Sequence, residues 1–333
     1  MTEKTPTVSV IIPTYNRAQL IGRALQSVLD QTYRDFEIIV VDDSTDNTGE
    51  IVRSFKDERI RYIKRDIRKG AGAARNTGIK AARGKYMAFQ DSDDEWLPEK
   101  LEKQMKVIET APPAVGVVYT DMLRISKAGE AKYWHSPTIV DGRLIDPKTS
   151  DYQALGLGIQ STLIKKECFD KAGLLDEDLP HLEDLELFIR MTRHYRFAHI
   201  KEPLVKYYAP GGITANTDAA VTAQNLLFQK YSKEIRNHRR FLAKWYFRMG
   251  SELCKNGQIE RGRVYLFKAA RKYPVNIKYL GAALASLTGQ KTYNSCAASY
   301  KKIRGLSAFG AVKNTTPSET NREVQRDRPL TGL

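Results

Sequence analysis

Alternating apolar strands and amphipathic helices fill the first 125 residues, and this alternation restricts the fold more than any other feature of the sequence. Continuous apolar runs, typical of buried strands, occupy residues 8–12, 36–41, 60–63, 86–89 and 115–119. Apolar side chains at helical spacing predict helices over residues 16–28, 44–55, 70–82 and 97–108, with Asn16 as the N-cap of the first. Repeated strand–helix units imply an α/β fold, with a mostly parallel, Rossmann-like sheet flanked by helices.

The rest of the chain has a different pattern. Residues 126–215 are less regular, with short helices predicted over residues 165–172 and 183–194, and residues 217–305 are predicted to be all-helical. Small residues around Gly250 and Gly257 resemble one TPR-like helix pair. We therefore expect an α/β domain over residues 1–216, a basic helical region over 217–310 and a disordered tail over 311–333.

The net charge of +15 belongs to the last third of the chain. Residues 1–230 contain 33 Lys and Arg against 33 Asp and Glu, whereas residues 231–333 contain 21 against 6. The high isoelectric point therefore does not predict a nucleic-acid-binding protein, and no RNA- or DNA-binding motif is visible. Two interpretations of the basic helices stay open: attachment to an anionic membrane surface, or solvated helical faces.

The cysteines and the N-terminus predict the compartment. Cys168, Cys254 and Cys296 are far apart and form no CxxC motif, which indicates free thiols in a reducing compartment. Residues 1–7 are polar and lack the features of a signal peptide, and the apolar stretch at residues 277–287 is too short to span a bilayer. We expect a cytoplasmic protein that is soluble or peripheral at the inner face of the cell membrane.

Polar clusters follow three of the predicted strands. They occupy residues 13–17, 42–46 and 90–96. Because ligands bind beyond the carboxyl ends of the strands in open parallel sheets, these clusters predict one binding site.

The acidic cluster after the fourth strand indicates a metal site. Asp91 and Asp93 place two carboxylates on one turn, and hard oxygen ligands suit Mg²⁺ or Mn²⁺. The alternative is that acidic residues favour a helix N-terminus, a role that suits Asp94 or Glu95.

Residues 70–78 are rich in Gly and Ala but do not form a dinucleotide fingerprint. The third Gly of GxGxxG is missing, and the segment follows the third strand instead of the first, which excludes a Rossmann dehydrogenase. Arg75 in this segment is placed to contact a phosphate or a base, and a solvated arginine is the alternative.

Taken together, these motifs resemble the family 2 glycosyltransferases, which have a GT-A-type fold. The resemblance runs from about residue 7 to residue 214 in the family's order and spacing. It rests on residues 8–17 (VSVIIPTYNR), 40–46 (VVDDSTD), 73–79 (AARNTGI), 89–96 (FQDSDDEW), 169–177 (FDKAGLLDE) and 182–190 (LEDLELFIR).

The resemblance implies roles for the matching positions. It implies a nucleotide pocket formed by Pro13, Thr14, Tyr15, Asn16, Arg17, Asp42, Asp43, Arg75, Asp91 and Ser92. Tyr15 would lie against the base and Asp42 would accept a hydrogen bond from uracil. Asp91 and Asp93 would be the DxD pair that holds Mn²⁺ or Mg²⁺ at the diphosphate, and Asp184 would be the catalytic base.

The implied activity is inverting, metal-dependent transfer of a hexose-type sugar from a nucleotide-sugar to a hydroxyl. A UDP-sugar donor and a glycan or lipid-linked acceptor in cell-surface polysaccharide synthesis are expected. The alternative is a nucleotide-sugar-binding protein without transferase activity. One departure from the family pattern is that residues 205–214 contain no His near Ala209, and Lys206 or Tyr208 could replace it at the phosphates.

Overall fold

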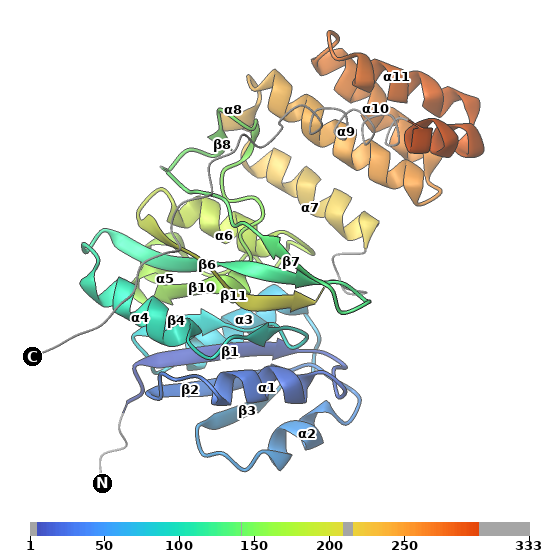
Figure 1. Cartoon of the computed structure of the whole chain (residues 1–333). Coiled ribbons are helices and arrows are strands. Elements are labelled where there is room, and N and C mark those ends of the chain that lie inside the picture. The colour runs from blue at the N-terminus through green and yellow to red at the C-terminus, as the bar shows by residue number, and fades with distance from the viewer. Residues whose placement is uncertain (1–4, 141, 209–215, 300–333) are drawn as a thin grey trace, which may run out of the picture. The chain divides into compact units, whose positions relative to one another are not determined.

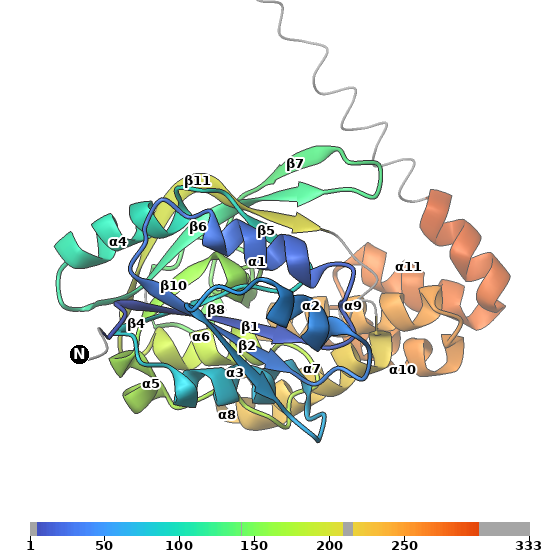
Figure 2. The same ribbon diagram turned by 90° about the horizontal axis from the view of Figure 1, so that it is seen from below.

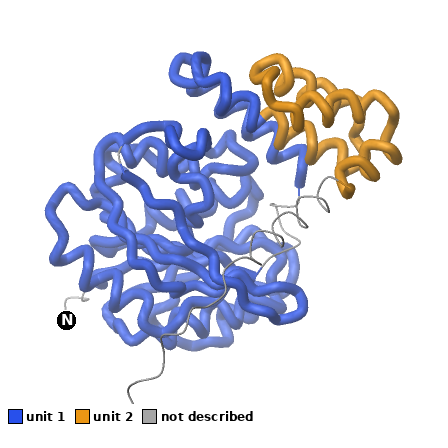
Figure 3. Tube along the Cα trace, turned by 45° about the horizontal axis from the view of Figure 1, so that its top comes forward, with its two compact units in different colours: residues 1–245 blue, residues 246–333 orange. Residues whose placement is uncertain are grey.

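The structure is a computed structural model that describes residues 5–140, 142–208 and 216–299. The chain divides into two compact units, residues 1–245 and residues 246–333 (Figure 3), and each is described by itself. Residues 217–245 belong to the first unit, so the domain boundary at residue 216 stays a prediction. The tail predicted over residues 311–333 lies outside the described residues.

A mixed nine-stranded sheet forms the centre of the first unit (Figure 1). Its strand order is β3-β2-β1-β4-β10-β6-β11-β5, and β7 pairs with β6. The strands are β1 (Val8–Thr14), β2 (Phe36–Asp42), β3 (Ile60–Lys64), β4 (Tyr86–Phe89), β5 (Glu95–Trp96), β6 (Val115–Ile125), β7 (Ala131–Trp134), β10 (Thr162–Lys165) and β11 (Arg196–Tyr208). A separate ladder joins β8 (Ile145–Asp146) and β9 (Asp151–Tyr152).

The strand directions divide the sheet into two halves. β1 is parallel to both of its neighbours, β2 and β4, and β3 is parallel to β2. β10 runs antiparallel between β4 and β6, and β5 runs antiparallel to β11. The α/β fold is as predicted, but the sheet is mixed because β10 and β5, which the pattern did not separate from loops, run against their neighbours.

Helices cover both faces of the parallel half. Figure 2 shows α1 and α4 on one side of β1 and β4, and α3 and α5 on the other. The helices of the first unit are α1 (Ile21–Leu29), α2 (Thr48–Ser54), α3 (Gly70–Ala81), α4 (Lys100–Thr110), α5 (Glu167–Ala172), α6 (Glu183–Met191), α7 (Thr217–Lys230) and α8 (Ser232–Ile235). Strands covered on both faces bury all their side chains, which explains the continuous apolar runs.

The small residues of α3 allow this helix to lie directly on the sheet. A Cβ at Gly78 would overlap the side chain of Ile11 in β1. On the opposite face, Val10 belongs to a core that includes Leu25 of α1 and Met105 of α4. The Gly- and Ala-rich sequence of α3 therefore sets how close its backbone comes to the binding edge of the sheet.

The second unit is helical where it is described. α9 (Arg239–Lys255) extends into it, α10 (Ile259–Lys272) and α11 (Ile277–Ala285) follow, and residues 290–299 are helical. Gly250 of α9 and Gly262 of α10 meet at the helix crossing, where a Cβ on Gly250 would lie 2.8 Å from the Gly262 carbonyl oxygen. Gly250, which was predicted to lie at a helix crossing, therefore does lie at the crossing of α9 and α10. None of the described helices is both long and apolar enough to cross a membrane.

Candidate active site

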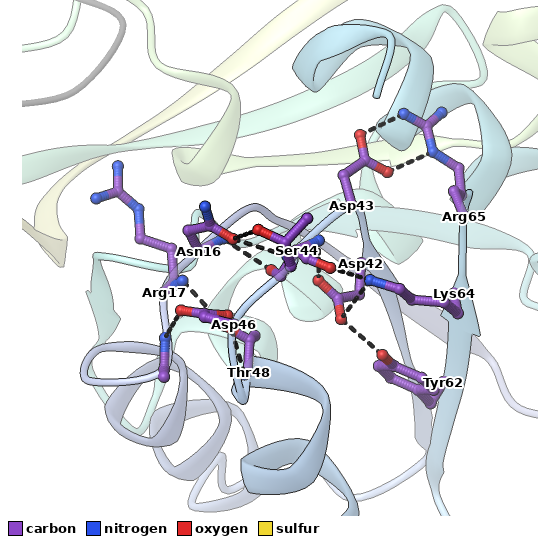
Figure 4. Close-up of polar contacts among 12 residues, drawn as sticks. Asn16, Arg17, Asp42, Asp43, Ser44, Asp46, Thr48, Tyr62, Lys64 and Arg65 are labelled. Atoms are coloured by element: carbon purple, nitrogen blue, oxygen red, sulfur yellow. Dashed lines mark hydrogen bonds and ion pairs between the residues drawn. The ribbon is translucent and has the colours of Figure 1, made fainter. Parts of the chain in front are cut away.

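The three polar clusters lie together because they follow β2, β1 and β4, which are neighbours in the sheet. The loop after β1 is tied to the loop after β2 by Asn16 (Figure 4). The Asn16 backbone N–H donates to Ser44 Oγ at 2.7 Å, and its Oδ1 accepts from the Thr45 backbone N–H at 2.9 Å. The loops after β1 and β2 are therefore joined at the edge of the sheet where the strand ends predicted a binding site.

The structure corrects the local role of Asn16. Its φ of 51° is left-handed, and α1 begins at Ile21 with Leu20 at the N-cap position. Asn16 therefore does not cap α1, because its side chain is used to join the two loops. Next to it, the Arg17 backbone N–H donates to Thr48 Oγ1 at 3.0 Å.

Asp42 at the end of β2 is buried and held on both carboxylate oxygens. Tyr62 Oη donates to Asp42 Oδ2 at 2.6 Å, and the Ser44 backbone N–H donates to Oδ1 at 2.7 Å. Lys64 Nζ lies 3.7 Å from Oδ2 (Figure 4). Burial and the Asp42 carboxylate raise the pKa of Tyr62 to about 12, so Tyr62 remains a hydrogen-bond donor at neutral pH. Asp42 thus presents a carboxylate of fixed orientation at the predicted base pocket.

Asp43 faces away from Asp42, toward Arg65 (Figure 4). Arg65 Nε and Nη2 each donate to this carboxylate at 2.6 Å, a bidentate pair. Its predicted place alongside Asp42 in the nucleotide pocket therefore stays a prediction, while the observed contact is with the protein.

The end of β1 and the residue after it differ in exposure. Thr14 is buried, and its Oγ1 has no hydrogen-bond partner among the described residues. Tyr15 is 39% exposed, and the Arg68 guanidinium lies 3.9 Å from its ring centroid. Pro13, also in β1, is half-buried. Arg68 was not among the predicted residues, because a basic loop residue carries no signal of its stacking partner.

The acidic loop after β4 is fixed by two arginines from the first loop and α1. Arg17 Nη2 lies 3.3 Å from Asp93 Oδ2, and Arg23 donates to the Asp93 carbonyl oxygen. Burial, with the negative charge of Asp91, nevertheless raises the pKa of Asp93. Ser92 between the two aspartates is buried. The loop therefore holds negative charge that the protein neutralises only in part.

Asp94 and Glu95 hold the loop to the rest of the sheet. The Asp94 carboxylate accepts from the Tyr208 backbone N–H at 3.0 Å and from Gln160 Nε2 at 3.1 Å. Glu95 accepts from Lys206 Nζ at 2.5 Å and from Tyr208 Oη at 2.9 Å. Lys206 and Tyr208, suggested as phosphate contacts, thus bind Glu95 in this structure. Gln160 was not predicted, because it belongs to no motif that could have revealed it.

Arg75 connects the acidic loop to the start of α6. Its Nη2 donates to Asp91 Oδ1 and its Nη1 donates to Glu183 Oε1, each at 2.7 Å. Its side chain is only 7% exposed. Burial opposes the charge of Arg75, but the carboxylates of Asp91 and Glu183 outweigh burial and raise its pKa. The structure therefore places Arg75 between two protein carboxylates, and its direct contact with the nucleotide stays a prediction.

Asp184 follows Glu183 in the first turn of α6. Its Oδ1 accepts from the Leu185 backbone N–H at 2.7 Å. Burial and the neighbouring Glu183 raise the pKa of Asp184 to about 7, while Arg75 opposes this rise. A carboxyl group with a pKa near neutrality can accept a proton from a hydroxyl more readily than an ordinary aspartate can.

The acidic loop fits a divalent cation only as part of a larger ligand set. Among the described residues, no group of three or more His, Cys, Asp or Glu side chains is arranged to hold a metal. Asp91 and Asp93 supply two hard oxygen donors, and the raised pKa of Asp93 indicates charge that a cation would compensate. Mg²⁺ and Mn²⁺ typically bind through one or two carboxylates, with waters and substrate phosphates completing the shell. The donor set therefore fits a cation that arrives with a diphosphate.

Sequence comparison identifies relatives of the chain. Residues 9–163 match the sequence model described as Glycosyl transferase family 2. Escherichia coli WfaP, named UDP-Glc:alpha-D-GlcNAc-diphosphoundecaprenol beta-1,3-glucosyltransferase, is 30% identical over 245 residues, 72% of this chain and 92% of WfaP. Bacillus subtilis (strain 168) TuaG, a putative teichuronic acid biosynthesis glycosyltransferase by name, is 39% identical over 140 residues, 41% of this chain and 56% of TuaG.

Structural comparison supports the same fold. Staphylococcus aureus TarS 1–349, solved in complex with UDP, has a TM-score of 0.51 at 18% identity, and the match covers 87% of this chain and 91% of that one. This likeness bears on the GT-A-like architecture, in which a mixed sheet with flanking helices is followed by a helical C-terminal region. With the family match and a relative similar over most of its length, the chain belongs to the family 2 glycosyltransferases and is a transferase enzyme.

Proposed function

We propose that this enzyme transfers a sugar from a UDP-sugar, with inversion, to a hydroxyl group of a glycan or lipid-linked acceptor in cell-surface polysaccharide synthesis. The observation that carries the proposal is the Arg75 bridge. It holds Asp91, in the predicted donor motif, and Glu183, next to the predicted base, on one guanidinium at 2.7 Å each. A donor diphosphate and an acceptor hydroxyl bound at these two motifs would lie within one site.

The choice of donor and acceptor rests on the relatives. WfaP and Escherichia coli WfgD, 46% identical over 102 residues, are both named as glucosyltransferases that use UDP-Glc and a diphosphoundecaprenol-linked acceptor. The match to WfgD covers 40% of that protein. The fixed carboxylate of Asp42 supports a base with N–H donors, such as uracil.

In the proposed mechanism, Asp184 removes the proton from the acceptor hydroxyl. The acceptor oxygen then forms a bond to the anomeric carbon as the bond to the diphosphate oxygen breaks, and the proton remains on the Asp184 carboxylate. Its pKa of about 7 suits this transfer at neutral pH. Arg75 fixes the acidic loop relative to the segment that carries the base, through its hydrogen bonds to Asp91 and Glu183.

Asp91 and Asp93 would hold Mn²⁺ or Mg²⁺ together with the donor. The cation would supply neutralisation of the charge on the departing diphosphate. Arg17 and Arg23 support this role because they fix the acidic loop at Asp93. The proposal also places the enzyme in the cytoplasm at an anionic membrane surface, where a lipid-linked acceptor would be presented.

The decisive experiment measures nucleoside diphosphate release from a panel of UDP-sugars and GDP-sugars with a lipid-linked acceptor, with and without Mn²⁺. We expect release only with donor, acceptor and cation together.

Asp93→Ala should lose Mn²⁺-dependent UDP binding in calorimetry, and the exposed Glu99→Ala should bind like the wild type. UDP binding that ignores Mn²⁺ in the wild type would refute the metal role. Activity with a GDP-sugar alone would refute the donor.

A further inference from the structure

Helix α11 presents apolar side chains to the exterior. Ile277, Leu280 and Leu284 in α11 and Leu287 just after it are 84%, 47%, 52% and 55% exposed. Their spacing of three, four and three residues puts them on one side of the helix. Ala283, by contrast, is buried in the core of the second unit, and Tyr279 and Ala282 pack against that core. The larger apolar side chains of α11 are therefore exposed and are not covered by the described residues.

The neighbouring residues extend this apolar character. Val264 and Phe267 of α10 and Val275 in the connection to α11 are 53%, 41% and 74% exposed. Seven of the twelve large hydrophobic side chains exposed in the described chain thus lie between residues 264 and 287. So many exposed apolar side chains in one short segment are unusual, since scattered single apolar residues are the ordinary state of a protein surface.

The sequence that carries these side chains is basic, and the acidic residue just before it, Glu260, is paired with Arg263 at 2.9 Å. No Asp or Glu occurs between Glu260 and Glu319, while the same stretch contains eleven Lys and Arg residues. Among the described residues of the stretch, Arg261, Lys268, Arg271 and Lys291 are exposed. The partner must therefore offer both an apolar interior and negative charge.

An anionic lipid bilayer meets both requirements better than a second copy of this chain does. In a symmetric dimer the same patch meets itself, so the basic residues of the two copies would repel each other. A helix with apolar residues on one face and basic residues beside it lies in the headgroup region of anionic membranes. We propose that α11, with the basic side chains around it, is a membrane-docking face whose apolar stripe inserts into an anionic lipid surface.

This inference extends the proposed function, in which the acceptor is carried on a lipid, but its test needs no catalysis. The full chain is sedimented with vesicles of phosphatidylcholine, with and without phosphatidylglycerol. We expect binding only with phosphatidylglycerol, weakening at high salt. Leu280→Ser/Leu284→Ser should reduce the partition coefficient about tenfold or more. Val140→Ser is the matched control, because Val140 is 77% exposed in the first unit and should not affect binding.

A second double variant tests the proposal independently if the first one misfolds. Arg271→Glu/Lys291→Glu leaves the apolar stripe intact and should also weaken binding to the anionic vesicles about tenfold. Unaltered binding by both double variants, or no binding by the wild type, would overturn the proposal. So would a dimer of the wild type that Leu280→Ser/Leu284→Ser abolishes in ultracentrifugation. A protein that binds vesicles but transfers no sugar would contradict the proposed function alone.

Discussion

Asp184 is the residue whose protonation should control activity. Its pKa of about 7 is set first by burial and then by Glu183. We expect kcat/KM to rise with pH below about 7 and to level off above it, because the base must be ionised. Asp184→Asn should lower kcat about 100-fold or more. Asp178→Asn, an exposed neighbour, is the control and should keep wild-type activity. A flat pH profile would argue against Asp184 as the base.

The raised pKa of Asp184 also affects the stability of the folded protein. Between the unfolded pKa of about 3.9 and the folded pKa of about 7, the folded protein binds more protons at Asp184 than the unfolded chain does. Stability contributed by this residue therefore falls as pH rises through that window. The free energy of unfolding of Asp184→Asn should exceed that of the wild type by about 1 kcal/mol or more at pH 8, with a higher melting temperature, and the two proteins should be similarly stable near pH 4. Equal melting at pH 8 would mean that the carboxylate is better solvated than the structure indicates.

Arg75 should act on the base without contacting substrate. Since its charge opposes the rise in the Asp184 pKa, Arg75→Met should move the acidic limb of the kcat/KM profile to higher pH. Arg75→Lys keeps the positive charge and should restore most of the wild-type profile. A role in nucleotide binding alone would instead raise the KM for the donor and leave the pH profile in place.

At the scale of elements, the crossing of α9 and α10 sets the packing of the second unit. A Cβ at Gly262 would overlap Cys254 Sγ and lie 3.0 Å from the Cys254 backbone nitrogen. We expect Gly262→Ala to destabilise this unit by about 1–2 kcal/mol, because overpacking outweighs the gain in helix propensity. Gly281→Ala in α11 has open space and should stabilise by about 0.5 kcal/mol. Urea unfolding of the two variants measures both values, and a stable Gly262→Ala would show that the helices can separate.

Elements with strong local patterns were predictable, and elements defined by their partners were not. β1 and β2 are long apolar runs, and α3, predicted over residues 70–82, spans Gly70–Ala81. β10 has four residues and β5 has two, so neither has a period that a local pattern can show. α2 begins at Thr48, later than predicted, because Ser44 and Asp46 are engaged with the loop after β1.

At the scale of the whole molecule, the sequence indicated where the site lies better than what each residue contacts. The strand ends predicted that the loops at Asn16, Asp42 and Asp91 meet, because strand order and direction follow from the repeated units. The Arg75–Glu183 pair spans 108 residues, and no local pattern reports such a partner. The same holds for Gln160 with Asp94, which lie 66 residues apart.

The distribution of charge also becomes more specific in three dimensions. The excess of +15 was assigned to residues 231–333 as a whole, with membrane attachment and solvated helices both open. The structure adds the exposed apolar side chains of residues 264–287, which a purely solvated helical face would not need.

The Arg75 bridge limits how this enzyme can be recombined with its relatives. Protein engineers who graft the acceptor-side segment of one transferase onto the donor-side segment of another will cut the chain between residues 91 and 183. Such a chimaera inherits the arginine from one parent and its glutamate partner from the other. An active hybrid should therefore need an arginine in the donor-side parent and a glutamate in the acceptor-side parent, a requirement that can be checked before any gene is assembled.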